Sequence, residues 1–218
     1  KFLFEHERTT STELTIETPG GIAACSLKHA RGRVTEVEVD MGKAEFAASK
    51  IPVLSASEEI IDEPVQIDGT DLLVTAVSVG NPHCVVLLEN LKALNLNEWG
   101  PALEHHVLFP NRTNVQFVQV IAPDRVRIVV WERGAGHTKA SGSSACAVVA
   151  TCVRKGLTQR KVSVEMEGGT VDIEVKDDFR ILMRGPASEV YMGRISEEFI
   201  WALTHKSKVM EPTSSAFV

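Results

Sequence analysis

Three short stretches of the sequence carry polar side chains of the kinds that bind and ionise small molecules. They are GNPH, FPNRTN and WERGAG, and each lies beside a run of apolar residues. Their polar members are Asn81, His83, Asn114, Glu132 and Arg133. An arginine can hold a carboxylate through two hydrogen bonds, an asparagine both donates and accepts, and a histidine ordinarily titrates near neutrality. Each residue also fits a structural role at a strand end, so from the residues alone a structural role and a site for a small charged molecule both stay open.

A Ser-Gly-Ser-Ser turn precedes an apolar helix predicted over residues 143–156. The helix is apolar or small on every face until its last turn, which predicts that it is buried, and Gly156 is suited to end it. The first N–H groups of a buried helix need acceptors. Two interpretations stay open from this turn alone. Either Ser141 or Ser143 caps the helix, or an anionic ligand group binds to the amides and the helix dipole.

The turn does not match the known phosphate loops. Gly134-Ala135-Gly136 lacks the third glycine of a dinucleotide fingerprint, and Lys139 has no glycine before it, as a Walker A loop requires. Gly142-Ser143-Ser144 is not the GxSxG of a nucleophile elbow. His105 and His106 are adjacent and have no carboxylate at HExxH spacing, so no metal site is expected.

The elements that must position these residues are mostly strands. Alternation with a period of two predicts strands at 12–18, 34–40, 71–77, 114–120, 125–132, 161–166 and 170–175. Helices are predicted at 95–106 with Asn97 as the N-cap, at 143–156 and at 196–206, and residues 211–218 are expected to form a tail. Many strands and one buried helix indicate an α+β fold, in which a barrel-like sheet surrounds a central helix.

Composition narrows the function classes. The net charge of -6 and the lack of a lysine or arginine run argue against a nucleic-acid or membrane surface. Apolar stretches fall short of the roughly 20 residues of a membrane span, and no signal peptide is recognisable. The four cysteines, Cys25, Cys84, Cys146 and Cys152, lack finger spacing and are expected to be reduced, as in the cytoplasm. The apolar start at Lys1 predicts that the chain is part of a longer one.

The motifs GNPHCV, FPNRTNVQF and WERGAGHTKASGSSACA, in this order and spacing, resemble the carboxyl-terminal two-thirds of a diaminopimelate epimerase. The segments TPGG and VDMG fall where the middle segments of that family lie. The resemblance runs from about Lys1 to Ile195. It favours the anion site over the ordinary cap.

The resemblance implies an isomerase that uses no cofactor and interconverts LL- and meso-diaminopimelate in lysine and peptidoglycan precursor synthesis. Members of the family invert the α-carbon with two cysteines, in a cleft between two alike halves, each a curled, mostly antiparallel sheet around a central helix. Residues 41–186 would form the second half. Residues 1–40 and 187–218, with a strand near 187–195, would be the rest of an incomplete first half and the tail. A homodimer through a sheet edge is left open.

The resemblance also implies roles for single residues. Substrate-binding positions of the family match Asn81, Asn114, Glu132, Arg133, Gly142 and Ser143. His83 and Glu132 match positions that support the acid/base pair. Ser141 stands where the family has its second catalytic cysteine, because ASGSSA replaces ACGTGA or a near variant.

Ser141 is therefore a departure from the family pattern. A serine hydroxyl is a much weaker acid than a thiol, and it would need a neighbouring base such as His137. The first cysteine of the family would lie before Lys1. Cys146 lies about 140° around the helix from Ser141, at 3.6 residues per turn, so it is interpreted as core, like Cys84.

Three interpretations of the function remain open. The chain is an amino-acid epimerase or racemase of this family. Alternatively, one surviving base acts on another amino acid by racemisation or elimination. The third interpretation is a protein that binds an amino acid without turning it over.

Overall fold

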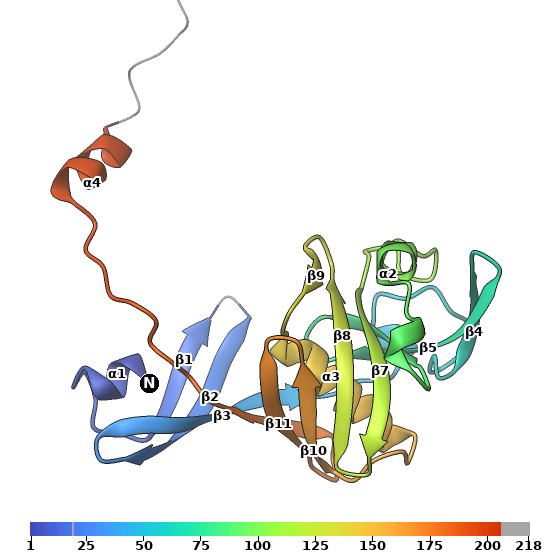
Figure 1. Ribbon diagram of the computed structural model, residues 1–218, viewed down its shortest axis with the longest axis horizontal. Coiled ribbons are helices and arrows are strands. Elements are labelled where there is room, and N and C mark those ends of the chain that lie inside the picture. Colours follow the sequence, from blue (N-terminus) through green and yellow to red (C-terminus); the bar gives the residue numbers. More distant parts are fainter. Residues whose placement is uncertain (19, 206–218) are drawn as a thin grey trace, which may run out of the picture. The chain divides into compact units, whose positions relative to one another are not determined.

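The computed structural model describes residues 1–18 and 20–205, so the expected tail at 211–218 lies outside the described residues. The chain divides into two units, Lys1–Ala187 and Ser188–Val218. The described part of the first unit holds a twelve-stranded sheet with three α-helices (Figure 1). In the second unit, α4 (Glu197–Thr204) begins at Ser196, whose side chain accepts a hydrogen bond from the backbone N–H of Phe199.

The elements of the first unit follow one another along the chain. They are α1 (Phe2–Glu5), β1 (Glu13–Thr18), β2 (Gly21–Ala30), β3 (Arg33–Lys43), the 3₁₀ helix η1 (Ala48–Lys50), β4 (Glu63–Ile67), β5 (Thr70–Ser78), β6 (Pro82–Leu87), the 3₁₀ helix η2 (Leu91–Ala93), α2 (Leu96–Glu104), β7 (Asn114–Ala122), β8 (Arg125–Glu132), β9 (Gly136–Thr138), α3 (Gly142–Arg154), β10 (Lys161–Met166), β11 (Gly169–Val175) and β12 (Arg180–Gly185).

The strands form one curled, mixed sheet. Their order is β1-β2-β3-β12-β11-β10-β8-β7-β6-β5-β4, and β9 pairs with β8. Neighbouring strands are antiparallel except at two places, where β10 runs parallel to β8 and β6 runs parallel to β7. The chain is therefore a mostly-strand α+β protein, as the alternating sequence predicts. Among the described residues, no helix is long and apolar enough to cross a membrane.

Alternation along β7 and β8 gives the sheet two apolar faces. On one face, Val118 and Ile128 belong to the same cluster as the side chains of α3. On the other face, Val115 and Phe117 pack with Leu103 of α2. Because residues two apart on a strand share a face, this alternation decides which polar side chains at the strand ends point towards α3.

Apolar side chains cover α3. Its residues from Ser144 to Cys152 are all buried, and it contacts β5, β6, β7, β10, β11 and β12. A helix without a polar face is stable in water only when every face is covered, so the composition of this segment explains its place in the core. The chain leaves the helix through Gly156, whose φ of 69° lies in the left-handed region that favours glycine.

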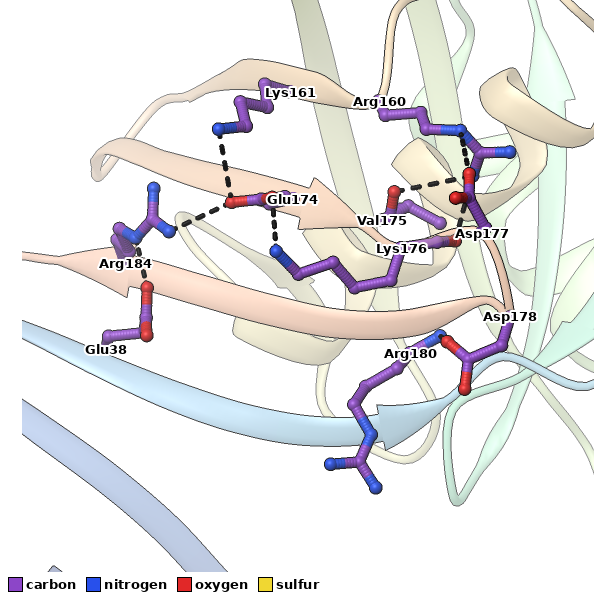
Figure 2. Close-up of polar contacts among 10 residues, drawn as sticks. All are labelled: Glu38, Arg160, Lys161, Glu174, Val175, Lys176, Asp177, Asp178, Arg180 and Arg184. Atoms are coloured by element: carbon purple, nitrogen blue, oxygen red, sulfur yellow. Dashed lines mark hydrogen bonds and ion pairs between the residues drawn. The ribbon is translucent and has the colours of Figure 1, made fainter.

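Charged side chains join β3, β12 and β11 (Figure 2). The Arg184 guanidinium lies 2.9 Å from the Glu174 carboxylate and also contacts Glu38. Lys161 Nζ lies 3.6 Å from the same Glu174 carboxylate. A hydrogen bond from Lys176 is the main cause that lowers the pKa of Glu174. Because β3 carries the chain from the β1–β2 hairpin into the rest of the sheet, these ion pairs fasten that connection.

The structure corrects several sequence predictions. A strand is expected near 187–195, but the described residues 186–196 contain none. The last strand is instead β12, which pairs with β3 and β11 and whose apolar residues do not alternate with polar ones. Strands β2, β4 and β9 are also not predicted, and alanine-rich β2 carries few strand-forming residues. In α2 the N-cap is Asn95 rather than Asn97.

Candidate active site

The ends of three neighbouring strands lie side by side at one end of the sheet. β6 begins at Pro82, β7 begins at Asn114, and β8, antiparallel to β7, ends at Glu132. His83 and Asn114 are partners across the parallel ladder between β6 and β7. His83, Asn114 and Glu132 each lie an even number of residues from side chains that pack with α3, so they share that face of the sheet. The three polar motifs of the sequence therefore converge.

A buried hydrogen bond joins the start of α3 to these strand ends. Gln116 Nε2 on β7 donates to Ser144 Oγ at 3.0 Å, and both residues are fully buried. Gln116 lies two residues after Asn114 and so shares its face of the strand. This contact is not among the sequence predictions. Its only signal is a polar residue at an apolar-face position of an alternating strand.

His83 is fully buried at the start of β6. Its Nε2 lies 2.9 Å from Asn81 Oδ1, so the two residues of the GNPH motif contact each other. Its pKa is lowered to about 4, mainly by burial; a hydrogen bond with Gln116 opposes the lowering, and the positive charge of Arg133 contributes to it. The imidazole is therefore neutral at pH 7, in contrast to an exposed histidine.

Asn114 uses its amide to join two segments of the site. Its Nδ2 donates to the carbonyl oxygen of Pro82 at 2.9 Å, and its Oδ1 accepts from the backbone N–H of Arg133 at 3.0 Å. The side chain is buried. Asn114 thus fixes the start of β6 relative to the end of β8.

Glu132 and Arg133 stand at the turn between β8 and β9. Glu132 is half-buried, and its Oε1 accepts a hydrogen bond from the Thr138 hydroxyl at 2.6 Å. Arg133 is exposed and donates from Nη1 to the carbonyl oxygen of Asn111 at 3.2 Å. The turn that follows needs Gly134, whose φ is 78°. Part of the glycine content of this motif therefore serves the turn itself.

Ser141 is the N-cap of α3 with an extended backbone, but its side chain makes no capping hydrogen bond. Its carbonyl oxygen accepts from the N–H of Ala145 at 3.1 Å, and its own N–H lies 3.5 Å from Met166 Sδ. Residues 141–143 are only half-buried. The helix start is therefore not closed by the Ser141 hydroxyl.

Met183 of β12 packs on the first turn of α3. A Cβ atom added to Gly142 would lie 2.9 Å from Met183 Sδ, closer than real contacts allow. Gly142 therefore lets the strand approach the helix start. His137, the expected helper of Ser141, is exposed on β9, and its Nε2 lies 3.4 Å from the Glu167 carboxylate.

The cysteines of α3 do not lie at its start. Cys146 and Cys152 are fully buried, and burial raises the pKa of each to about 12. Cys84 on β6 is also buried, and burial raises its pKa. All four cysteines are unpaired. Within residues 1–18 and 20–205, no group of three or more His, Cys, Asp or Glu side chains could hold a metal ion.

A buried carboxylate lies on the other face of β8. Glu104, at the end of α2, is 3% exposed. It accepts hydrogen bonds from Trp131 Nε1 at 2.8 Å and from the N–H of Gly134 at 2.9 Å. Glu104 is not predicted from the sequence, because its partners are distant in the sequence and no local pattern marks them.

The sequence of this chain is similar to those of known proteins. Residues 75–190 match the family model described as diaminopimelate epimerase. The curated diaminopimelate epimerase of Desulfitobacterium hafniense is 39% identical over 198 residues, which cover 91% of this chain and 70% of that protein. The one from Methanococcus maripaludis is 41% identical over 196 residues, which cover 89% of this chain and 71% of that protein.

Solved structures share the fold at low identity. A probable proline racemase from Agrobacterium radiobacter has a TM-score of 0.65 at 11% identity, covering 89% of this chain and 64% of that one. A hydroxyproline epimerase from Agrobacterium vitis, solved with bound trans-4-hydroxy-L-proline, has a TM-score of 0.63 at 12% identity, covering 85% of this chain and 60% of that one. The chain thus spans less than two thirds of these two solved chains, and the likeness concerns the fold.

Proposed function

This chain belongs to the diaminopimelate epimerase family, and from that premise we propose that its site binds diaminopimelate and serves its epimerisation at Cα, between the LL and meso forms. The observation that carries the proposal is the convergence of the three polar motifs beside the first turn of α3. An epimerase of this kind takes part in lysine synthesis and acts as an isomerase.

The start of α3 is the proposed seat of the substrate α-carboxylate. The amides of Gly142 and Ser143 stand at the positive end of the helix dipole, on a half-buried surface that the Ser141 side chain leaves uncapped. Arg133 would add its guanidinium from the β8–β9 turn. A carbanion beside a carboxylate forms more readily when that carboxylate is neutralised, so this arrangement serves proton transfer at Cα.

Glu132, His83 and the asparagines are proposed to orient the amino group and the reacting centre. The Glu132 carboxylate is held by Thr138, and neutral His83 is held by Asn81, so both present fixed hydrogen-bonding groups to a ligand at the helix start. A neutral imidazole donates or accepts without adding charge. Asn114 holds the two segments together.

Ser141 limits the chemistry in this proposal. A hydroxyl at the helix start is a far weaker acid than a thiol. The helix dipole would lower the pKa of a thiol there and favour the thiolate at neutral pH. The two cysteines of α3 are buried with raised pKa and do not supply that thiolate. The chain is therefore expected to bind diaminopimelate and to exchange the Cα proton slowly.

The family also suggests the domain organisation. We propose that residues 41–186 form one epimerase half, with α3 as the central helix of a barrel-like sheet, and that residues 1–40 and 187–218 are the remainder of the incomplete, pseudo-symmetric first half plus a tail. The covering of α3 by strands from both ends of this segment supports that assignment. Cytoplasmic location and a homodimer belong to the same proposal.

The test is incubation of the chain with LL-diaminopimelate in deuterated water, followed by NMR at Cα. Binding with deuterium entry and inversion supports the epimerase. Deuterium entry without inversion would indicate that a single base acts, and binding without exchange would indicate a binding protein. Elimination is tested separately with a β-hydroxy amino acid, from which it would release water. The variant Arg133→Gln is expected to weaken binding, whereas Arg125→Gln, at the opposite end of β8, serves as the matched control. If the chain binds neither the LL nor the meso form of diaminopimelate, the proposal is overturned.

A further inference from the structure

Glu104 links two loops of the site from behind the sheet. Its carboxylate accepts from Trp131 Nε1 and from the N–H of Gly134, and these two donors flank Glu132 and Arg133 in the sequence. Trp131 points away from α3, into the cluster that contains α2. The buried carboxylate therefore holds Glu132, the last residue of β8, and Arg133, which follows it, from the face opposite the ligand.

The second loop precedes Asn114. Arg112 Nη1 lies 3.5 Å from Glu104 Oε1, and the N–H of Thr113 donates to the carbonyl oxygen of Glu104 at 3.3 Å. Glu104 thus contacts two segments through its side chain and its main chain. One segment leads into Asn114, and the other follows Glu132. The bond from the Arg133 N–H to Asn114 then closes the connection between the two segments.

The negative charge of Glu104 allows its carboxylate to accept the hydrogen bonds of both Trp131 and Gly134. Burial alone raises the pKa of its carboxyl, but the hydrogen bonds from Trp131 and Gly134, with Arg112 nearby, outweigh burial and lower it. A carboxylate only accepts hydrogen bonds, so both oxygens can face N–H donors. A glutamine would turn an NH₂ group towards one of them and leave a buried donor unsatisfied.

We propose that Glu104 is a positioning residue, which orients Glu132 and Arg133 towards the start of α3 by fixing the β8–β9 turn. Its effect on ligand binding rests on the proposed function. Its effect on the turn does not, since the contacts exist without ligand.

The test compares Glu104→Gln with Glu98→Gln, an exposed glutamate on the same helix, in the full chain. Hydrogen exchange of backbone amides is measured by NMR without ligand. In Glu104→Gln the Gly134 amide should exchange about tenfold faster or more, since one buried hydrogen bond is lost, while amides of α3 keep their rates. In Glu98→Gln the Gly134 amide should be unchanged. Equal acceleration throughout the molecule, or none at Gly134, would overturn the inference.

The second readout is affinity for meso-diaminopimelate, measured by calorimetry at a temperature where every variant is fully folded. Glu104→Gln should weaken binding about tenfold, and Glu98→Gln should bind as the parent does. Unchanged affinity in Glu104→Gln would overturn the positioning role. If the parent itself does not bind, the proposed function fails and the amide exchange alone decides the inference. Should Glu104→Gln not fold, Trp131→Phe removes one donor and must still accelerate exchange at Gly134.

Discussion

Gln116 on β7 donates a hydrogen bond to the hydroxyl of Ser144 in the first turn of α3, at 3.0 Å and out of contact with water. This contact ties the helix start to the strand that carries Asn114. Because it joins the first turn of the helix to the strand directly, it sets how the helix dipole faces the strand ends.

Replacing Gln116 tests this contact. In Gln116→Leu the buried Ser144 hydroxyl loses its donor, and we expect the free energy of unfolding to fall by about 1–3 kcal/mol. Adding Ser144→Ala should recover much of the loss, because replacing both partners by apolar groups removes the unsatisfied atom. Urea denaturation of the single and double variants measures both effects. A double variant less stable than Gln116→Leu would contradict the role of the hydrogen bond.

Gly100 tests the packing behind the turn. A Cβ atom at Gly100 would lie 2.6 Å from the indole ring of Trp131, and the ring is held by Glu104. Although alanine is the better helix former, Gly100→Ala should lower the free energy of unfolding by about 1–3 kcal/mol through overpacking. Thermal unfolding measures the change, and the shift of the Trp131 indole resonance reports the displaced ring. A stabilised variant with an unmoved indole would show that the packing is looser than described.

His83 predicts a dependence of stability on pH. Burial is the main cause that lowers its pKa from 6.5 to about 4, so the unfolded chain binds a proton first as the pH falls. The contribution of His83 is therefore fully present above pH 6.5 and is lost progressively down to about pH 4. The total loss is about 3 kcal/mol, since one pKa unit corresponds to 1.36 kcal/mol.

The measurement is denaturation between pH 4 and pH 7 in His83→Gln and in His29→Gln, which replaces an exposed histidine. His83→Gln should show a flatter pH profile than the parent, and His29→Gln should keep the slope of the parent. Identical slopes in all three proteins would mean that His83 does not titrate as its burial requires.

Much of the fold follows from local patterns. β7 and β8 alternate between residues that face α3 and residues that face α2, and such alternation is visible in the sequence. The apolar segment around Cys146 could only be a buried helix. β12 could not be predicted in the same way, because it pairs with β3, which is distant in the sequence. β2 pairs with its neighbours β1 and β3, but it carries few strand-forming residues.

Part of the candidate site can likewise be predicted from local sequence patterns, and part cannot. Asn81, His83, Asn114, Glu132 and Arg133 carry residue types and spacing that mark them, and the structure brings their segments together. Glu104 and Gln116 act through hydrogen bonds to residues that are distant in the sequence, so only the folded chain identifies them. The neutral state of His83 likewise depends on burial, which no residue type determines.

The most direct test of the account concerns the residue at the helix start. Ser141→Cys places a thiol at the N-cap of α3, where the helix dipole lowers its pKa. The variant and the parent are incubated with each form of diaminopimelate in deuterated water, and deuterium at Cα is followed by NMR. The control is Ser57→Cys, which places a thiol at an exposed position outside the site. The account predicts much faster exchange in Ser141→Cys alone, whereas exchange no faster than in the parent would contradict a substrate seated against the start of α3.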